Sequence, residues 1–189
     1  WSAFAVETRR GSTDRVLPTR TASRADAPSY LQERDSAGTR PVVCLVCSSG
    51  GHFAELYRLQ TAWCDFEPLW ITFDAHDTHS VLRDQRMIRA YGPTNRSLVN
   101  LARNAVLAWR VIARERPVAV VSTGAGVAVP FLLVARLRRI GSIYIESLAR
   151  VSDLSLSGRI AYHIAQEFLV QWPGLTERYP RTRYEGRVL

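Results

Sequence analysis

Two short glycine-rich segments combine residue types that suit the binding of a phosphate or diphosphate. The first comes directly after the apolar run at 42–47 and consists of Ser48, Ser49, Gly50, Gly51 and His52. Glycines let a ligand come close to the main chain, and the N–H groups and dipole at the start of a following helix attract an anion. The serine hydroxyls add donors, and a histidine in the first helical turn could donate to an anion or transfer a proton. A tight strand-to-helix turn with a capping serine explains this segment about equally well.

The second segment has the same character and shifts the balance towards a ligand site. It contains Thr123, Gly124 and Gly126, and it again lies between an apolar run and a helical pattern. Two anion-receptive helix starts at one edge of a sheet suit a diphosphate-bearing ligand better than coincidence does. Neither segment is a P-loop, which needs G-K-[ST], or a complete G-x-G-x-x-G, so the glycines alone do not identify the ligand.

Three charged residues are further candidates for the site. Glu146 follows the apolar run at 142–145, and it either binds sugar hydroxyls or is a solvated carboxylate or the partner of Arg150. Arg150 is itself a candidate contact to the ligand. Arg96 could contact a phosphate, whereas the residues on either side of it are explained as helix caps. We expect neither a metal nor a cofactor in this site.

The chain from Pro41 onward alternates between strand and helix patterns, which must position these residues. Apolar and β-branched runs predict six strands, at 42–47, 68–74, 86–91, 118–123, 142–147 and 168–172. Helical spacing predicts helices between them, at 52–63, 80–84, 97–116, 127–140 and 155–167. We therefore predict a doubly wound, Rossmann-like α/β domain with parallel strands and right-handed crossovers. In such sheets ligands bind beyond the carboxyl ends of the strands, where both glycine segments and Glu146 lie.

The composition is that of one globular domain with a polar tail. The chain has 189 residues, of which 47% are hydrophobic, and this is enough for a real core. Residues 1–40 are rich in Arg, Ser, Thr, Asp and Pro without apolar periodicity, so we predict a disordered tail there. The first residue is Trp, which suggests a fragment or a misplaced start.

Charge and cysteine content bound the function classes. The formal net charge is +8 with a pI near 10.1, and every basic residue is an arginine, which suits phosphates, anionic lipid or nucleic acid. No window approaches eighteen consecutive uncharged apolar residues, so no transmembrane helix is predicted.

Cys44 and Cys47 have C-x-x-C spacing, but positions i and i+3 of a strand point to opposite faces. We therefore expect core cysteines in a reducing, cytoplasmic compartment rather than a redox or zinc pair.

The motifs, taken in order, resemble those of a known family. The sequence contains, one after another, VCSSGGHFAEL, LWITFD, YGPTNRSLVNLARNAVLAWRVIARERP, VVSTGAGVAVPF, IYIESLARV and FLVQWP. Together they resemble the glycosyltransferase subunits of the PssD type in exopolysaccharide synthesis. Those are similar to the membrane-recruiting subunit of the two-subunit UDP-N-acetylglucosamine transferase of dolichol-linked oligosaccharide synthesis. The resemblance covers about 41–189.

The resemblance implies the N-terminal half of a GT-B glycosyltransferase such as MurG, whose glycine loops face a polyprenyl-diphosphate acceptor. By it, Ser49 to His52 and Thr123 to Gly126 form the acceptor loops, and His52 and Glu146 are the candidate catalytic residues. Glu146 stands where MurG-like enzymes carry the acid of an H-E-Q-N segment, although this chain reads IESL there. A GT-B enzyme also needs a second half for the nucleotide sugar. The resemblance therefore implies a separate donor-binding glycosyltransferase subunit as partner, and a chain that is inactive alone.

A membrane surface is the other expected partner. The helix at 97–116 and the segment at 131–140 both combine aliphatic side chains with several arginines, a pattern that can lie in an anionic interface. For each helix considered singly, a core-facing helix with a solvated charged face is the favoured explanation. Since a lipid-linked acceptor is reached from the bilayer, we expect a peripheral protein at the cytoplasmic face of the plasma membrane.

Two other function classes remain open at this point. The pI suggests a basic nucleic-acid-binding module, but the arginines are scattered over helices and no RNP, KH or helix-turn-helix signature occurs, so we expect no nucleic-acid partner. A self-sufficient nucleotide-binding Rossmann enzyme would need the G-x-G-x-x-G run and its acidic ribose partner.

Overall fold

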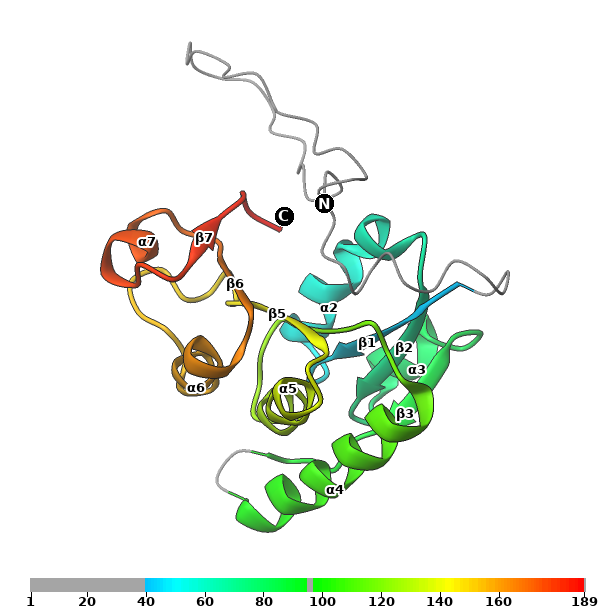
Figure 1. Cartoon of the computed structure of the whole chain (residues 1–189). Helices are drawn as coiled ribbons and strands as arrows, with labels where there is room; N and C mark the ends of the chain where they lie inside the picture. Colours follow the sequence, from blue (N-terminus) through cyan, green and yellow to red (C-terminus); the bar gives the residue numbers. More distant parts are fainter. Residues whose placement is uncertain (1–39, 95–96, 189) are drawn as a thin grey trace.

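One parallel sheet organises the protein. The computed structural model describes residues 40–94 and 97–188, so the expected tail falls almost wholly outside the described residues. The sheet has seven strands in the order β3-β2-β1-β4-β5-β6-β7, and each neighbouring pair is parallel (Figure 1). The strands are β1 (Val42–Val46), β2 (Glu67–Thr72), β3 (Arg86–Arg89), β4 (Ala119–Ser122), β5 (Gly141–Ile145), β6 (Glu167–Val170) and β7 (Arg183–Tyr184). The predicted doubly wound α/β fold is confirmed.

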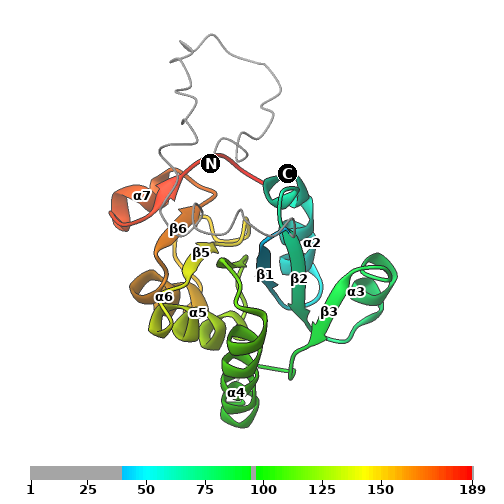
Figure 2. The same ribbon diagram turned by 45° about the vertical axis from the view of Figure 1, so that its right-hand side comes forward.

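Helices cover both faces of the sheet. They are α2 (Gly51–Arg58), the 3₁₀ turn η3 (Gln60–Trp63), α3 (His76–Val81), α4 (Leu98–Glu115), α5 (Ala128–Leu137), α6 (Leu156–Ile164) and α7 (Gly174–Arg178). The helices α4, α5 and α6 pack side by side on one face, whereas α2 and η3 lie on the other (Figures 1 and 2). The chain thus winds in both directions from β1, which is the arrangement that creates a ligand crevice.

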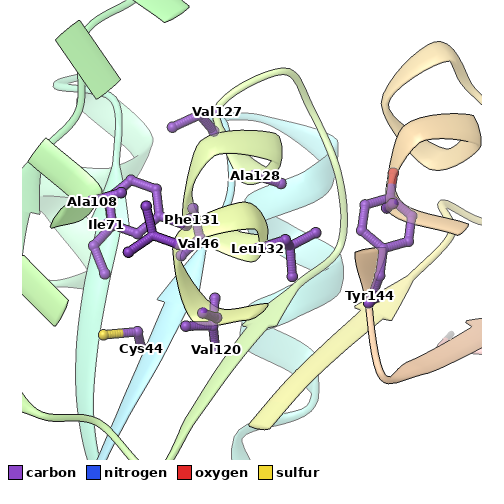
Figure 3. Packing of buried hydrophobic residues seen from close by; sticks show 14 of the residues in the cluster. Cys44, Val46, Ile71, Ala108, Val120, Val127, Ala128, Phe131, Leu132 and Tyr144 are labelled. Carbon is purple, nitrogen blue, oxygen red and sulfur yellow. The ribbon is translucent and has the colours of Figure 1, made fainter. Parts of the chain in front are cut away.

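The alternation of side chains along β1 divides the core into two layers. Cys44 and Val46 belong to the cluster under α4 and α5, in which Phe131 of α5 lies beside Ile71 and Ala108 (Figure 3). Cys47 belongs to the cluster on the opposite face. Burial raises the pKa of both β1 thiols to about 12, so they are inert core side chains. The prediction that the C-x-x-C pair cannot act together is confirmed.

The structure departs from the predicted elements in three places. The helix predicted at 52–63 ends at Arg58. Beyond it the Leu59 N–H donates to the carbonyl oxygen of Leu56, three residues earlier, and the chain continues as the tighter 3₁₀ turn η3. The short helix lies at 76–81 rather than 80–84, since the buried Thr78 hydroxyl bonds the main chain at its start. Neither α7 nor β7 was predicted, because five and two residues are too few to show a period.

Candidate functional site

The two glycine segments lie next to each other at the carboxyl edge of the sheet. The strands β1 and β4 are direct neighbours, with Val46 opposite Ser122, so the segments that follow them start side by side. From there α2 goes to one face and α5 to the other, which makes this the topological switch point of the sheet. Open α/β sheets bind their ligands at this position.

A reciprocal pair of hydrogen bonds joins the segments. The Nδ1 atom of His52 lies 2.8 Å from the carbonyl oxygen of Thr123, and the hydroxyl of Thr123 donates to the carbonyl oxygen of His52 at 2.6 Å. Because a carbonyl only accepts, Nδ1 must carry a proton, and the second nitrogen, Nε2, stays available. The imidazole can therefore accept a proton at Nε2 or, once charged, donate from Nε2 to an anion.

Gly124 is required where these groups meet. Its φ is +121°, and a Cβ there would come within 2.9 Å of His52 Cε1 and 3.1 Å of the Tyr144 hydroxyl. Gly126 is constrained from another direction, because a Cβ would lie 3.0 Å from the Thr94 hydroxyl. The second glycine segment is thus shaped by close approach to three other segments of the chain.

The first glycine segment is open above its main chain. A Cβ on Gly50 or Gly51 would meet nothing within 4 Å. Gly50 has a φ of +78°, and its N–H donates to the Asp77 carboxylate at 2.7 Å, so this group is not available to a ligand. The first helical hydrogen bond of α2 runs from Ala54 N to Gly50 O, which leaves the N–H groups of residues 51–53 ahead of it. These three groups are the anion-receptive part of the segment.

Ser48 and Ser49 are half-buried at the end of β1, and their hydroxyls bond to none of the residues that the structure describes. They remain candidates as donors to a ligand. Arg96 lies outside the described residues. Arg150 is exposed, and no carboxylate in the described ranges forms an ion pair with it.

Glu146 is fully buried, and other groups occupy both of its oxygens. Oε1 accepts from the Ser147 N–H at 3.2 Å, and Oε2 accepts from the N–H and hydroxyl of Ser155 at 3.0 and 3.1 Å. Burial raises the pKa of this carboxyl, and the hydrogen bonds from Ser155 and Ser147 oppose that shift. The alternatives of a solvated carboxylate and an ion pair with Arg150 are therefore wrong. Glu146 holds the start of α6, and a contact to sugar stays a prediction.

Tyr144 lies between Glu146 and the second glycine segment. Its hydroxyl points towards the start of α6 (Figure 3) and lies 3.3 Å from the Ser155 hydroxyl, which in turn bonds Glu146. The same hydroxyl and the ring of His52 both border Gly124, since a Cβ there would lie 3.1 and 2.9 Å from them. Burial raises the pKa of Tyr144, which keeps the phenol neutral. Glu146 and Tyr144 are thus joined through Ser155, whereas no hydrogen bond among the described residues links this group to His52.

Sequence reasoning missed several members of this site, namely Glu55, Asp77, Tyr144, Ser155 and Gln171. Glu55 lies one helical turn after His52, and this spacing could have shown that both face the same side of α2. Ser155 carried only the local signal of a helix cap, through its bond to the Gly158 N–H. Asp77, Tyr144 and Gln171 carried no local signal, because their partners in the site are distant in the sequence.

Possible metal ligands, membrane spans and cavities are further features of the described part of the chain. No group of three or more His, Cys, Asp or Glu side chains there could hold a metal ion, and no helix there is long and apolar enough to cross a bilayer. A cavity of about 460 Å³ lies beside α3, lined by residues that include His76, His79 and Arg83, and it shares no residue with the glycine segments.

Comparison with solved structures supports the fold. MurG from Acinetobacter baumannii aligns with a TM-score of 0.58 at 18% identity, covering 76% of this chain and 44% of that chain. The UDP-N-acetylglucosamine 2-epimerase from Rickettsia bellii aligns with a TM-score of 0.60 at 12% identity, covering 78% and 45%. The chain therefore has the fold of a little under half of each of these proteins. The expected resemblance to half of a GT-B glycosyltransferase is confirmed.

Sequence comparison identifies relatives. The UDP-N-acetylglucosamine transferase subunit ALG14 of Eremothecium gossypii is 44% identical over 107 residues, which are 52% of this chain and 48% of the relative. The human protein of the same name is 38% identical over 89 residues, which are 44% and 41%. The Candida albicans protein is 28% identical over 187 residues, which are 86% and 84%. In the first two matches the chain spans less than half the length of its relative.

A family model described as "Oligosaccharide biosynthesis protein Alg14 like" matches residues 86–188, more than half of the chain. The matched range includes the second glycine segment and Glu146. A nucleic-acid-binding module finds no support in the fold or in these relatives, as the scattered arginines had indicated. The expected resemblance to a subunit of a UDP-N-acetylglucosamine transferase is confirmed, whereas the resemblance to PssD-type subunits stays a prediction. The chain belongs to the Alg14-like family of oligosaccharide biosynthesis proteins.

Proposed function

We propose that this chain is the acceptor-binding subunit of a two-component UDP-N-acetylglucosamine transferase in lipid-linked oligosaccharide or polysaccharide synthesis. Its relatives are named as subunits of a UDP-N-acetylglucosamine transferase, and this supports both the reaction and the need for a donor-binding partner. Residues 41–189 would form the acceptor-binding domain. The chain alone would transfer no sugar, because the nucleotide sugar would bind to the partner.

The joining of the two glycine segments by His52 and Thr123 carries this proposal. It sets the free N–H groups of residues 51–53 beside the ring of His52 at the switch point of the sheet. A diphosphate accepts from main-chain N–H groups and from a charged imidazole, and neither requires a metal ion. The acceptor that this site suits is a polyprenyl diphosphate bearing a sugar.

His52 has two possible tasks that its geometry allows. With Nδ1 bound to Thr123, the neutral ring offers Nε2 as a base for the proton of an attacking sugar hydroxyl. The protonated ring offers an N–H at the same place to a phosphate oxygen. Both tasks need the ring held by the Thr123 carbonyl, so both disappear when the side chain is removed.

A bilayer surface would bring the acceptor to this site. The helices α4 and α5 expose large apolar side chains, among them Leu98 at 81%, Trp109 at 50% and Leu137 at 66% exposed. The guanidinium of Arg138 stacks on the Trp109 ring at 4.2 Å, and arginines flank the apolar positions. Apolar side chains bordered by arginine suit an anionic membrane surface, and we propose peripheral binding there, at the cytoplasmic face.

The test is a transfer assay with the product of a neighbouring gene as the candidate donor-binding partner. The two proteins are co-expressed, and membranes are assayed with radiolabelled UDP-N-acetylglucosamine and, for comparison, other UDP-sugars. We expect transfer only when both proteins are present. Robust turnover by the isolated, homogeneous chain would refute the two-component proposal.

The variant His52→Ala tests the site itself. Loss of one charge-assisted hydrogen bond, about 1.5–3 kcal/mol, should lower the rate roughly tenfold to a hundredfold while the fold stays intact. His76→Ala is the matched control, because His76 is exposed at the start of α3 and forms no hydrogen bond with either glycine segment among the described residues. Full activity of His52→Ala across acceptor concentrations would mean that the first segment is only a turn.

A further inference from the structure

The main chain at Leu148, in the segment after β5, is held by side chains from two other elements. Glu55 of α2 accepts the Leu148 N–H at 3.3 Å and the neighbouring Ser147 hydroxyl at 2.8 Å, both at Oε1. The indole of Trp172, just after β6, donates to the Leu148 carbonyl oxygen at 2.7 Å. Both main-chain polar groups of Leu148 are therefore bound by side chains, which fixes the path of the segment.

Gln171 completes this arrangement from the end of β6. Its Nε2 donates to the Glu146 carbonyl oxygen at 3.0 Å and faces Oε2 of Glu55 at 3.4 Å. Its Oε1 accepts from the Val188 N–H at 2.8 Å. Gln171 is only 2% exposed, and these partners fix which way its amide points. The Gln171 amide therefore presents a donor, and only a donor, to Glu55.

Glu55 thereby links the segment after β5 to the proposed diphosphate site. It lies one turn after His52 on α2, so neighbouring side chains of this helix bond the segment after β4 and the segment after β5. Arg150 follows Leu148 by two residues and is exposed, and its charge partly offsets the rise that burial causes in the pKa of Tyr144 and of Glu146. The position of this cation depends on the segment that Glu55 holds.

We propose that Glu55 is a positioning residue, which through Ser147 and Leu148 holds the segment carrying Arg150 in place beside the first glycine segment. The proposal rests on the proposed function of this site as a diphosphate-binding site. Glu55 does not itself suit a contact to the ligand, because its oxygens are occupied by protein donors and its charge repels an anion.

The variant Glu55→Gln separates positioning from simple electrostatics, because the two predict opposite signs. Removing a negative charge near an anion should tighten its binding if charge alone matters. If Glu55 positions the segment, binding should weaken, because the new amide sets N–H groups against the Gln171 donor and loosens the hold on Leu148. Glu177→Gln is the matched control, since it removes the same charge from an exposed position on α7.

Two measurements on the full-length chain test this. Farnesyl diphosphate is titrated as the probe, and we expect its Kd to rise about tenfold in Glu55→Gln and to stay unchanged in Glu177→Gln. The indole N–H resonance of Trp172, assigned with Trp172→Phe, should shift in Glu55→Gln, because this group bonds Leu148. In the reconstituted complex the KM for the lipid acceptor should rise while the KM for the UDP-sugar stays the same.

The possible outcomes separate the positioning role of Glu55 from the proposed function of the site. Binding of farnesyl diphosphate that Glu55→Gln leaves unchanged or tightens would overturn the positioning role alone. A parallel rise of both KM values, or an unmoved Trp172 resonance, would overturn it as well. A wild-type chain that does not bind farnesyl diphosphate would overturn the proposed function, and the positioning role with it.

Discussion

Gly158, in the first turn of α6, offers a test of how tightly the buried carboxylate is packed. A Cβ at this position would overlap Oε2 of Glu146, lie 3.0 Å from its Cδ and lie 2.9 Å from the Ser155 hydroxyl. Helix propensity alone predicts that Gly158→Ala stabilises the protein by about 1 kcal/mol. The structure predicts the opposite sign, because the new methyl group displaces a carboxylate that has no room to move.

Two terms outweigh the gain in propensity. Overpacking a buried site costs about 1–3 kcal/mol. Disturbing the hydrogen bonds from Ser155 to a buried carboxylate costs about 1–3 kcal/mol more. After subtraction of the propensity term we expect a net destabilisation of about 1–5 kcal/mol. For a domain of this size that lowers the melting temperature by about 2–20 °C.

Thermal and urea unfolding of four variants provide the assay, namely Gly158→Ala, Glu146→Ala, the double variant of both and Gly174→Ala. Gly174→Ala is the control, because a Cβ there meets nothing within 4 Å, and we expect it to be nearly neutral. The double variant Gly158→Ala with Glu146→Ala should be more stable than the sum of its single changes, since removing the carboxylate makes room for the methyl group. The reasoning fails if Gly158→Ala melts at or above the wild-type temperature, or if the two changes are strictly additive.

Three further predictions follow from burial and backbone geometry. Cys64 is exposed and should react quickly with Ellman's reagent. Cys44 and Cys47 should react only after unfolding, because burial raises the pKa of each thiol to about 12. Fast labelling of all three cysteines in the folded protein would contradict this. Burial raises the pKa of the Glu146 carboxyl above 4.5, so the folded state binds this proton more tightly than the unfolded state does. The contribution of the protonated carboxyl to the free energy of unfolding should be complete below pH 4.5 and lost as pH rises through the folded-state pKa. Denaturation of the Glu146→Gln variant from pH 4 to 8 should lack this dependence. Gly51→Val should melt within a few degrees of wild type, since a Cβ there meets nothing within 4 Å. It should nevertheless abolish sugar transfer, because the side chain blocks access of the ligand to the main chain. A large loss of stability with no specific loss of transfer would mean that the segment is a turn without a ligand.

The sequence by itself determined the fold class and the location of the site. Apolar runs and helical spacing are local signals, and they predicted the first six strands and the long helix α4 to within a few residues. The two glycine segments were also visible locally, since each follows a strand pattern. Their place at the carboxyl ends of neighbouring strands followed from the alternation of strand and helix, because right-handed crossovers leave few ways to arrange such a chain.

Only the tertiary structure decided which groups in the site touch. His52 and Thr123 are 71 positions apart, and Glu55 and Ser147 are 92 positions apart. No local period links residues so distant. A single sequence read without an alignment of its relatives contains no record of their contact. The same reason explains why Glu146 was left open between a solvated and a ligand-binding carboxylate. Its burial depends on Ser155 and Gly158 of a helix whose packing against β5 becomes visible only once the chain is folded.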